Sequence, residues 1–181
     1  MILIVGLGNY KKEYQFNRHN FGFMAVDQII EQYGLIAKGK KFKSDFFQGN
    51  IHDHQVAILK PQTFMNLSGE AVLEAVCFYK IKVENIIVIH DELDLELGKI
   101  KIKKSGGNAG HNGLKSISQL VGNDYWRIRL GISRPIKTES QASVDVAGYV
   151  LSNFSQEQLP LVEIVIKNIT RELLTIIEQI D

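Results

Sequence analysis

The sequence has little cysteine, no long apolar run and almost no excess charge. Its single cysteine, Cys77, cannot form a disulfide within the chain, which fits a reducing cytoplasm. We expect this thiol to be buried in a helix rather than to be catalytic. No apolar run approaches the roughly 18–20 residues that span a bilayer, and the first residues are typical of a strand rather than a signal peptide. The formal net charge of +1 gives no global field of the kind that marks many nucleic-acid-binding proteins.

What is present is ordinary globular composition at the length of one domain. The chain has 181 residues, of which 45% are hydrophobic and 23% charged. A chain of this size buries enough surface to fold without a disulfide or a metal, so we expect one domain over residues 1–181. Lysines form two clusters, at 38–43 and 99–104, and for each cluster alone a solvated surface is the favoured interpretation.

Short β-branched runs and amphipathic segments follow one another along the chain, which predicts an α/β fold. Residues 46–59 are short enough to form a hairpin, so we expect a twisted, mixed central sheet covered by helices on both sides. The last helix has Ser155 and Gln158 as a capping pair, and Pro160 in its first turn. Its predicted buried face comprises Leu161, Val165, Ile169, Leu173, Ile176 and Ile180. The expected strands are 2–7, 46–51, 55–59, 86–89, 99–103 and 126–133, and the other expected helices are 20–33, 67–79 and 114–121.

The first candidate motif is Gly6-Leu7-Gly8, directly after the first strand. A dinucleotide-binding fingerprint needs a third glycine at position 11, which is Lys11, and no helix follows closely. We therefore reject that interpretation. Asn9 remains of interest, because open α/β sheets bind ligands at the carboxyl ends of their strands.

Two further motifs offer an acid–base pair. His19 precedes the first helix, and an imidazole can accept a proton from water near neutral pH. Asp91 follows the apolar run 86–89 within His90-Asp91-Glu92-Leu93-Asp94, and a buried carboxylate there could hold a histidine in one tautomer. Binding of Zn²⁺ or Mn²⁺ is the rival use, although no HExxH or paired-cysteine spacing supports it.

Two segments could bind a substrate. The glycine-rich stretch 105–113 allows close backbone approach and mobility, and it lies between Lys101, Lys103 and Lys104 on one side and Arg127 and Arg129 on the other. These cations could bind a phosphate, although without the other motifs a flexible loop beside a solvated strand is the favoured interpretation. In the stretch 61–69, an asparagine could either cap a helix or face the site as an amide, beside an apolar wall of Phe64 and Met65.

Taken together, these motifs resemble the bacterial peptidyl-tRNA hydrolase family over almost the whole chain. They occur in the order expected for that family: 5–9, Tyr14 with 17–20 and Gly22, 61–69, 90–95, 110–113 and 127–131.

The resemblance implies hydrolysis of the ester that joins a peptide to tRNA, with no cofactor and no metal. His19 then looks like the general base that activates water, Asp91 like its supporting carboxylate, and Asn9 like a residue that positions the reacting groups. The residues implied in substrate binding are Tyr14, Phe64, Asn66, His111 and Asn112. Those implied in contacting the 5′-phosphate of tRNA are Lys103 and Arg129. The implied partner is peptidyl-tRNA, and the implied state is a cytoplasmic monomer.

The sequence departs from the family pattern at two places. Tyr10-Lys11 replaces the usual Pro-Gly after Asn9, and residues 106–109 differ from the usual glycine-rich pattern, so both loops could be shaped differently. The alternatives left open are a non-catalytic RNA-binding relative, a metal-dependent amidohydrolase and a scaffold protein.

Overall fold

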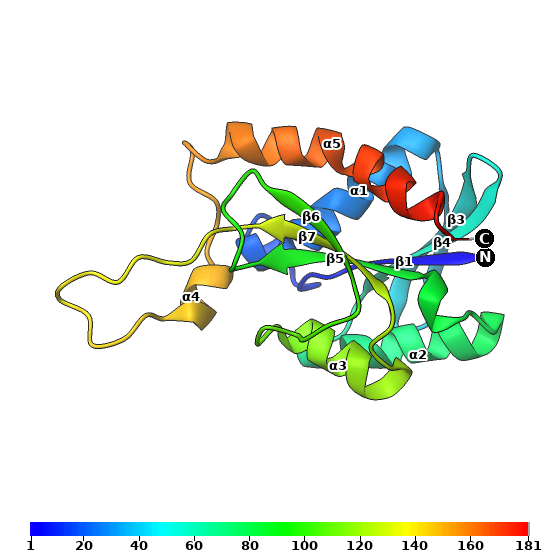
Figure 1. Ribbon diagram of the computed structural model, residues 1–181, viewed down its shortest axis with the longest axis horizontal. Helices are drawn as coiled ribbons and strands as arrows, with labels where there is room; N and C mark the ends of the chain where they lie inside the picture. The colour runs from blue at the N-terminus through cyan, green and yellow to red at the C-terminus, as the bar shows by residue number, and fades with distance from the viewer. Residues whose placement is uncertain (181) are drawn as a thin grey trace.

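The computed structural model describes residues 1–180, and its core is one seven-stranded mixed sheet (Figure 1). The strand order is β2-β3-β4-β1-β5-β7-β6. Neighbours β4, β1, β5 and β7 are mutually parallel, whereas β2, β3 and β6 pair in antiparallel fashion. The predicted mixed sheet is therefore confirmed. The strands are β1 (Ile2–Gly6), β2 (Ile36–Lys41), β3 (Ser44–Ile51), β4 (His54–Pro61), β5 (Ile86–Glu92), β6 (Ile100–Lys104) and β7 (Trp126–Gly131).

Helices cover both faces of this sheet. One face packs against α1 (Phe21–Tyr33) and α5 (Leu159–Ile177), and the other against α2 (Ser68–Tyr79) and α3 (Asn112–Val121). Successive strand residues point to opposite faces, so alternate residues of β1 and β5 enter different core clusters. Every residue of β1 and β5 is buried, which explains why β1 and the first four residues of β5 are apolar without alternation.

Three elements differ from the sequence prediction. β5 was expected to end at Ile89 but continues through Glu92, because β7 runs alongside it and pairs with each of these residues. β2 was not predicted; it is an exposed edge strand that carries lysines of the 38–43 cluster. A short helix, α4 (Val146–Val150), was also missed, since five residues are too few to display a helical period.

Three expectations about the helices differ from the structure: the buried face of α5, its capping pair and the burial of Cys77. Leu161 does not lie on the buried face of α5, where Val162 takes that place instead. The capping pair is half formed, because the Gln158 side chain accepts from the Ser155 N–H at 3.0 Å but no reciprocal bond is made. Cys77 is exposed on the outer side of α2, so its thiol is neither packed nor part of any catalytic cluster.

No helix within residues 1–180 is long and apolar enough to cross a membrane. The carboxyl ends of β1, β4, β5 and β7 meet at one edge of the sheet, since these strands are parallel. At this edge α4 lies beside the strand ends, and the segment 132–145 projects from it as a long arm (Figure 1).

Gly22, in the first turn of α1, brings the helix directly against the strand ends. A Cβ at this position would lie 2.3 Å from the Ile89 carbonyl oxygen and 2.5 Å from that of Leu7. Any side chain here would have to displace backbone on both β1 and β5. The close approach places the turn before α1 next to the end of β5.

We expect Gly22→Ala to lower the free energy of unfolding by about 1–3 kcal/mol, because the added methyl group overpacks a backbone contact. Denaturant unfolding measures this change. Gly107→Ala is the matched control, since a Cβ at Gly107 has no neighbour within 4 Å. Equal stability of the two variants would contradict the close approach of α1 to the sheet.

Candidate active site

The turn that carries His19 is held by backbone contacts to the segment that follows α4. Residues Arg18–Asn20 form a short 3₁₀ turn that leads into α1. The Arg18 N–H donates to the Ser152 carbonyl at 3.0 Å, and Asn17 forms a β-bridge with Asn153. The imidazole of His19 is thereby directed towards the end of β5.

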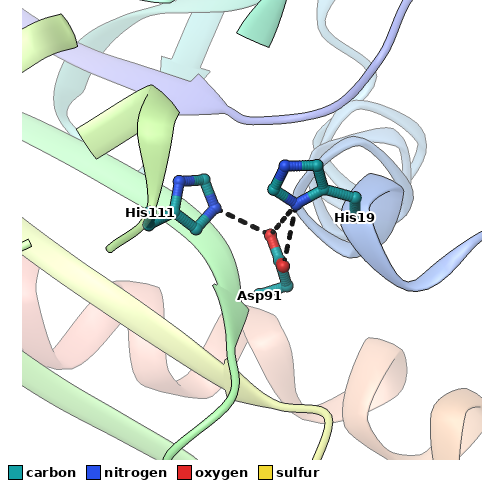
Figure 2. Close-up of side chains that lie close together, drawn as sticks. All are labelled: His19, Asp91 and His111. Carbon is teal, nitrogen blue, oxygen red and sulfur yellow. Dashed lines mark hydrogen bonds and ion pairs between the residues drawn. The ribbon is translucent and has the colours of Figure 1, made fainter. Parts of the chain in front are cut away.

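His19 and His111 converge on one carboxylate, that of Asp91 (Figure 2). His19 Nδ1 lies 3.0 and 2.9 Å from the two Asp91 oxygens, and His111 Nε2 lies 2.8 Å from Oδ1. Asp91 is buried, whereas 8% of the His111 side chain and 13% of the His19 side chain remain exposed. Three segments far apart in the sequence therefore meet in one polar cluster.

Backbone contacts determine which nitrogen of His111 carries its proton. Its Nδ1 accepts from the Gly113 and Leu114 N–H groups at 3.1 and 3.4 Å, so it caps the start of α3 with a lone pair. The proton of neutral His111 is consequently on Nε2, which donates to Asp91. Since His19 Nδ1–H also donates to Asp91, the Nε2 of neutral His19 keeps its lone pair. Figure 2 shows this second nitrogen turned away from the carboxylate.

The electrostatics of this cluster favour a protonatable His19 beside an ionised Asp91. Burial by itself would lower the pKa of His19, but the charge of Asp91 and the hydrogen bond to it prevail and raise that pKa above its usual value. For Asp91 the effects are reversed. Burial would raise the pKa of this carboxyl group, yet the two histidines hold that pKa well below its usual range. The carboxylate is therefore charged at neutral pH, and an imidazolium at His19 is stabilised.

His90, adjacent to Asp91, lies outside the cluster. Its Nδ1–H donates to the Asp91 carbonyl at 2.7 Å, and its ring packs edge-on against His111 at 5.2 Å between centroids. Complete burial, with the nearby His111 next in importance, lowers the pKa of His90 to about 3. The side chain is neutral at any physiological pH and supports its neighbours by packing.

A central cavity of about 460 Å³ opens beside the cluster. His19, Asp91 and His111 line it, together with Asn9, Asn112 and Met65. The wall opposite is apolar and comes from Val146, Ala147, Val150 and Leu151, in and just after α4. This wall was not predicted from the sequence. The available signal was Asp145, whose side chain accepts from the Gly148 N–H and caps the helix.

Arg18 connects this apolar wall to the His19 turn. Its buried guanidinium donates to the carbonyls of Tyr149 and Ser152 and to the side chain of Gln158, at 3.4, 3.3 and 2.9 Å. It also lies over the Tyr149 ring, 4.3 Å from the centroid. The residue next to His19 thus holds α4 in place.

The three predicted asparagines occupy different positions. The Asn9 side-chain oxygen accepts from the Lys11 N–H at 3.1 Å, while Asn20 clamps the Asn9 backbone through bonds of 2.7 and 2.9 Å. Asn112 is exposed and lines the cavity at the start of α3. Asn66 is exposed in the turn before α2 and is not among the residues that line the cavity. None of Asn20, Asn66 or Ser68 caps a helix with its side chain.

Tyr14 and Phe64 lie farther from the cluster. Tyr14 is half-buried in a 3₁₀ turn and does not line the cavity. Phe64 is 55% exposed and contacts Tyr10 edge-on, with the ring centroids 6.2 Å apart. Phe64 therefore lies at the rim, next in sequence to the cavity residue Met65.

Lys103 and Arg129 meet in a second cavity, of about 340 Å³, which we call the cation pocket. Lys103 lies opposite Arg127, and Lys101 opposite Arg129, in the antiparallel pairing of β6 with β7. Like charges facing one another across strands are destabilising without a counterion. Their gathering beside a cavity is typical of an anion-binding surface.

Both arginines already have partners. Arg129 donates to Glu92 at 2.9 Å, a contact that the sequence analysis did not foresee. Arg127 is buried and donates to the carbonyls of Gly106 and Gly107 at 2.8 and 2.5 Å. Arg127 thus holds the glycine-rich loop against the sheet, while Lys103 and the partly exposed Arg129 remain to receive a ligand.

The same cluster could be considered a metal site. Ligand atoms of His19, Asp91 and His111 lie within 4.8 Å of one another. However, the Nε2 of His111 carries the proton, because its Nδ1 is occupied by backbone N–H groups. A metal there would require that tautomer to reverse, so the hydrogen-bonded arrangement fits the donor set better.

This chain is similar to known proteins along almost its whole length. The family model described as Peptidyl-tRNA hydrolase matches residues 3–181. A Rickettsia bellii protein named peptidyl-tRNA hydrolase is 48% identical over 98% of this chain and 94% of its own length. A Wolbachia protein of the same name is 50% identical over 93% and 91%, respectively. The crystal structure of peptidyl-tRNA hydrolase from Acinetobacter baumannii superimposes with a TM-score of 0.90 at 38% identity, covering 99% of this chain and 90% of that one. The chain belongs to the peptidyl-tRNA hydrolase family.

Proposed function

We propose that this chain hydrolyses the ester between a peptide, or an N-blocked aminoacyl group, and tRNA, and so recycles stalled peptidyl-tRNA. The observation that carries the proposal is the His19–Asp91–His111 cluster, whose His19 Nε2 lone pair is left unused beside the central cavity. Membership of a family of hydrolases that act on this ester favours catalysis over a non-catalytic RNA-binding role.

In the proposed mechanism, His19 Nε2 takes a proton from water while the water oxygen attacks the ester carbonyl carbon. Asp91 stabilises the imidazolium that forms and keeps its Nδ1–H directed away from the substrate. The tetrahedral intermediate then collapses, the bond to the ribose oxygen breaks, and the imidazolium returns its proton to that oxygen. The products are tRNA and the peptide carboxylic acid, which releases its proton to solvent, and no covalent enzyme intermediate forms.

Amide groups around the cavity supply donors for the oxyanion. The Asn9 oxygen is engaged by the Lys11 N–H, which leaves its NH₂ group to donate. Asn112 offers a second amide from the start of α3. Such donors stabilise a developing oxyanion by about 3 kcal/mol each when preorganised. Phe64 contacts the substrate from the rim, and Asn66 and Tyr14 belong to the same proposed substrate-binding set.

The cation pocket contacts the 5′-phosphate of tRNA through Lys103 and Arg129. Phosphate contacts give affinity without base readout, which suits an enzyme that accepts many tRNAs. All of these residues come from one chain, which supports a monomeric enzyme. Its substrate arises during translation, which supports action in the cytoplasm. The reaction needs no cofactor.

We expect His19→Ala to lower turnover by about 10²–10⁴-fold while leaving tRNA affinity nearly unchanged, because only proton transfer is lost. Release of tRNA from N-acetyl-aminoacyl-tRNA is measured for both proteins in EDTA. Wild-type activity that disappears in EDTA would favour a metal-dependent amidohydrolase. An inactive wild type that binds tRNA would favour the RNA-binding alternative.

The rate should rise with pH through an inflection above 6.5, because His19 must be neutral to act and its pKa is raised. Asp91→Asn removes the charge that raises it, so the inflection should move to lower pH at a much reduced plateau. The profile of kcat/KM with N-acetyl-aminoacyl-tRNA, corrected for spontaneous hydrolysis, measures this. An inflection that stays in place in Asp91→Asn would argue against the proposed pair.

Lys103→Ala should raise KM by about tenfold for substrate with a 5′-phosphate and much less for substrate with a 5′-hydroxyl, as expected when one charge-assisted contact is lost. Arg129→Ala should act alike, but it also leaves Glu92 unpaired, so its stability must be measured alongside. Lys104→Ala is the matched control, since Lys104 follows on β6 without lining the pocket. Equal losses on both substrates would contradict the phosphate contact.

A further inference from the structure

Arg127 is a buried cation that forms no ion pair with a carboxylate in the part of the chain that the structure describes. Only 1% of the residue is exposed. The two carboxylates that line the cation pocket, those of Glu92 and Asp94, pair with Arg129 and Arg134 instead. The Nε of Arg127 also lacks a hydrogen-bond partner among the described residues. Because a guanidinium buried without a counterion is energetically costly, this arrangement favours an anion beside it.

The cation pocket offers a place for that anion. Arg127 lines this cavity together with Lys103 and Arg129, and Lys103 is paired with Arg127 across β6 and β7. Lys103 Nζ also lies against the glycine-rich loop, since a Cβ at Gly106 would be 2.4 Å from it. A phosphate bound by Lys103 and Arg129 is therefore held in the same cavity as the buried guanidinium and offsets its charge.

The same guanidinium fixes the conformation of the glycine-rich loop. Nη1 of Arg127 donates to the Gly107 carbonyl at 2.5 Å, and Nη2 donates to the Gly106 carbonyl at 2.8 Å. Within this loop Ala109 has a positive φ of 47°, which is unfavourable for a residue with a side chain. Contacts from outside the loop offset that cost, and the planar fork of Arg127 provides two of them.

The loop leads to His111, one of the two histidines that donate to Asp91. The His111 N–H donates to the Asn108 carbonyl at 2.8 Å, so the position of the imidazole follows the course of the loop. The Asn108 side-chain oxygen in turn lies 3.5 Å from Arg127 Nη2. A continuous series of contacts therefore runs from the cation pocket through Arg127 and the loop to His111, whose Nε2 lies 2.8 Å from the Asp91 carboxylate.

We propose that Arg127 is a positioning residue through which the 5′-phosphate of the substrate fixes His111 on Asp91. This inference rests on the proposed function, in which the cation pocket receives that phosphate. The phosphate offsets the buried charge of Arg127 and so stabilises the loop conformation that brings His111 to Asp91. The carboxylate then keeps its second hydrogen bond and stays in place to support His19. Phosphate binding is thereby coupled to turnover as well as to affinity.

The test measures kcat and KM on two substrates that differ only at the 5′ end: N-acetyl-aminoacyl-tRNA with a 5′-phosphate and the same molecule with a 5′-hydroxyl. For wild type we expect the phosphate to lower KM and also to raise kcat about fivefold, the lower end of common couplings between two sites. Arg127→Lys keeps a charge but loses the planar fork that holds two carbonyls. Its kcat should be equal on the two substrates, while the phosphate still lowers KM through Lys103 and Arg129.

The ratio of kcat on the two substrates does not depend on the fraction of enzyme that is folded, so a merely structural role of Arg127 would leave it unchanged. Asn123→Ala is a milder variant, because Asn123 is exposed, does not line the cation pocket and accepts from Arg127 Nη2 at 2.6 Å. It should lower the ratio about twofold, as expected when one hydrogen bond to the guanidinium is lost. Arg171→Lys is the matched control, since Arg171 is exposed on α5 and contacts Glu172, and its ratio should equal that of wild type.

Two results would overturn the coupling. One is a wild-type kcat that is the same with and without the phosphate. The other is a wild-type kcat ratio in both Arg127→Lys and Asn123→Ala, because the loop would then be positioned without the guanidinium. Failure of wild type to hydrolyse either substrate would instead refute the proposed function, so the two failures are distinguishable.

Discussion

The site depends on a single buried carboxylate that accepts hydrogen bonds from two histidines. A charged Asp91 in this position would be costly without partners, and His19 and His111 together offset that cost. The two imidazoles are not equivalent. His111 is committed at both nitrogens, to Asp91 and to the start of α3, whereas His19 is committed at one. That asymmetry leaves one basic nitrogen in the cluster available to react.

The surrounding fold positions His19, Asp91 and His111 largely through contacts with the backbone of neighbouring elements. Gly22 brings α1 against the strand ends, which positions the turn that carries His19. Arg18 joins that turn to α4, and hence to the apolar wall of the central cavity. His111 is positioned by the helix that it caps. Each histidine therefore gains its orientation from an element that also shapes the cavity, so base and binding surface are held together.

Of the cationic side chains on β6 and β7, only some remain accessible to a ligand. The guanidinium of Arg127 donates its hydrogen bonds to the glycine-rich loop, and that of Arg129 forms an ion pair with Glu92. Lys103 lies beside them without such a bond to a carboxylate among the described residues. The strand order places the cation pocket to one side of the central pair β1–β5, where β7 and β6 lie.

The sequence by itself determined the fold class, the buried strands and the residues that meet at the site. Apolar runs without alternation marked β1 and β5, because strands covered on both faces need no polar side. His19, Asp91 and Asn9 were identified from short motifs that follow a strand end or precede a helix, and Asn112 was identified from the family resemblance. Tertiary structure alone decided how far β5 extends, because its last three residues are polar and become strand only by pairing with β7.

Tertiary structure also decided the tautomer of His111, the pairing of Arg129 with Glu92 and the wall formed by α4. Each depends on contacts between segments far apart in the chain, which local periodicity does not encode. The exposure of Cys77 and Leu161 has the same origin, because burial on a helix depends on what packs against each face.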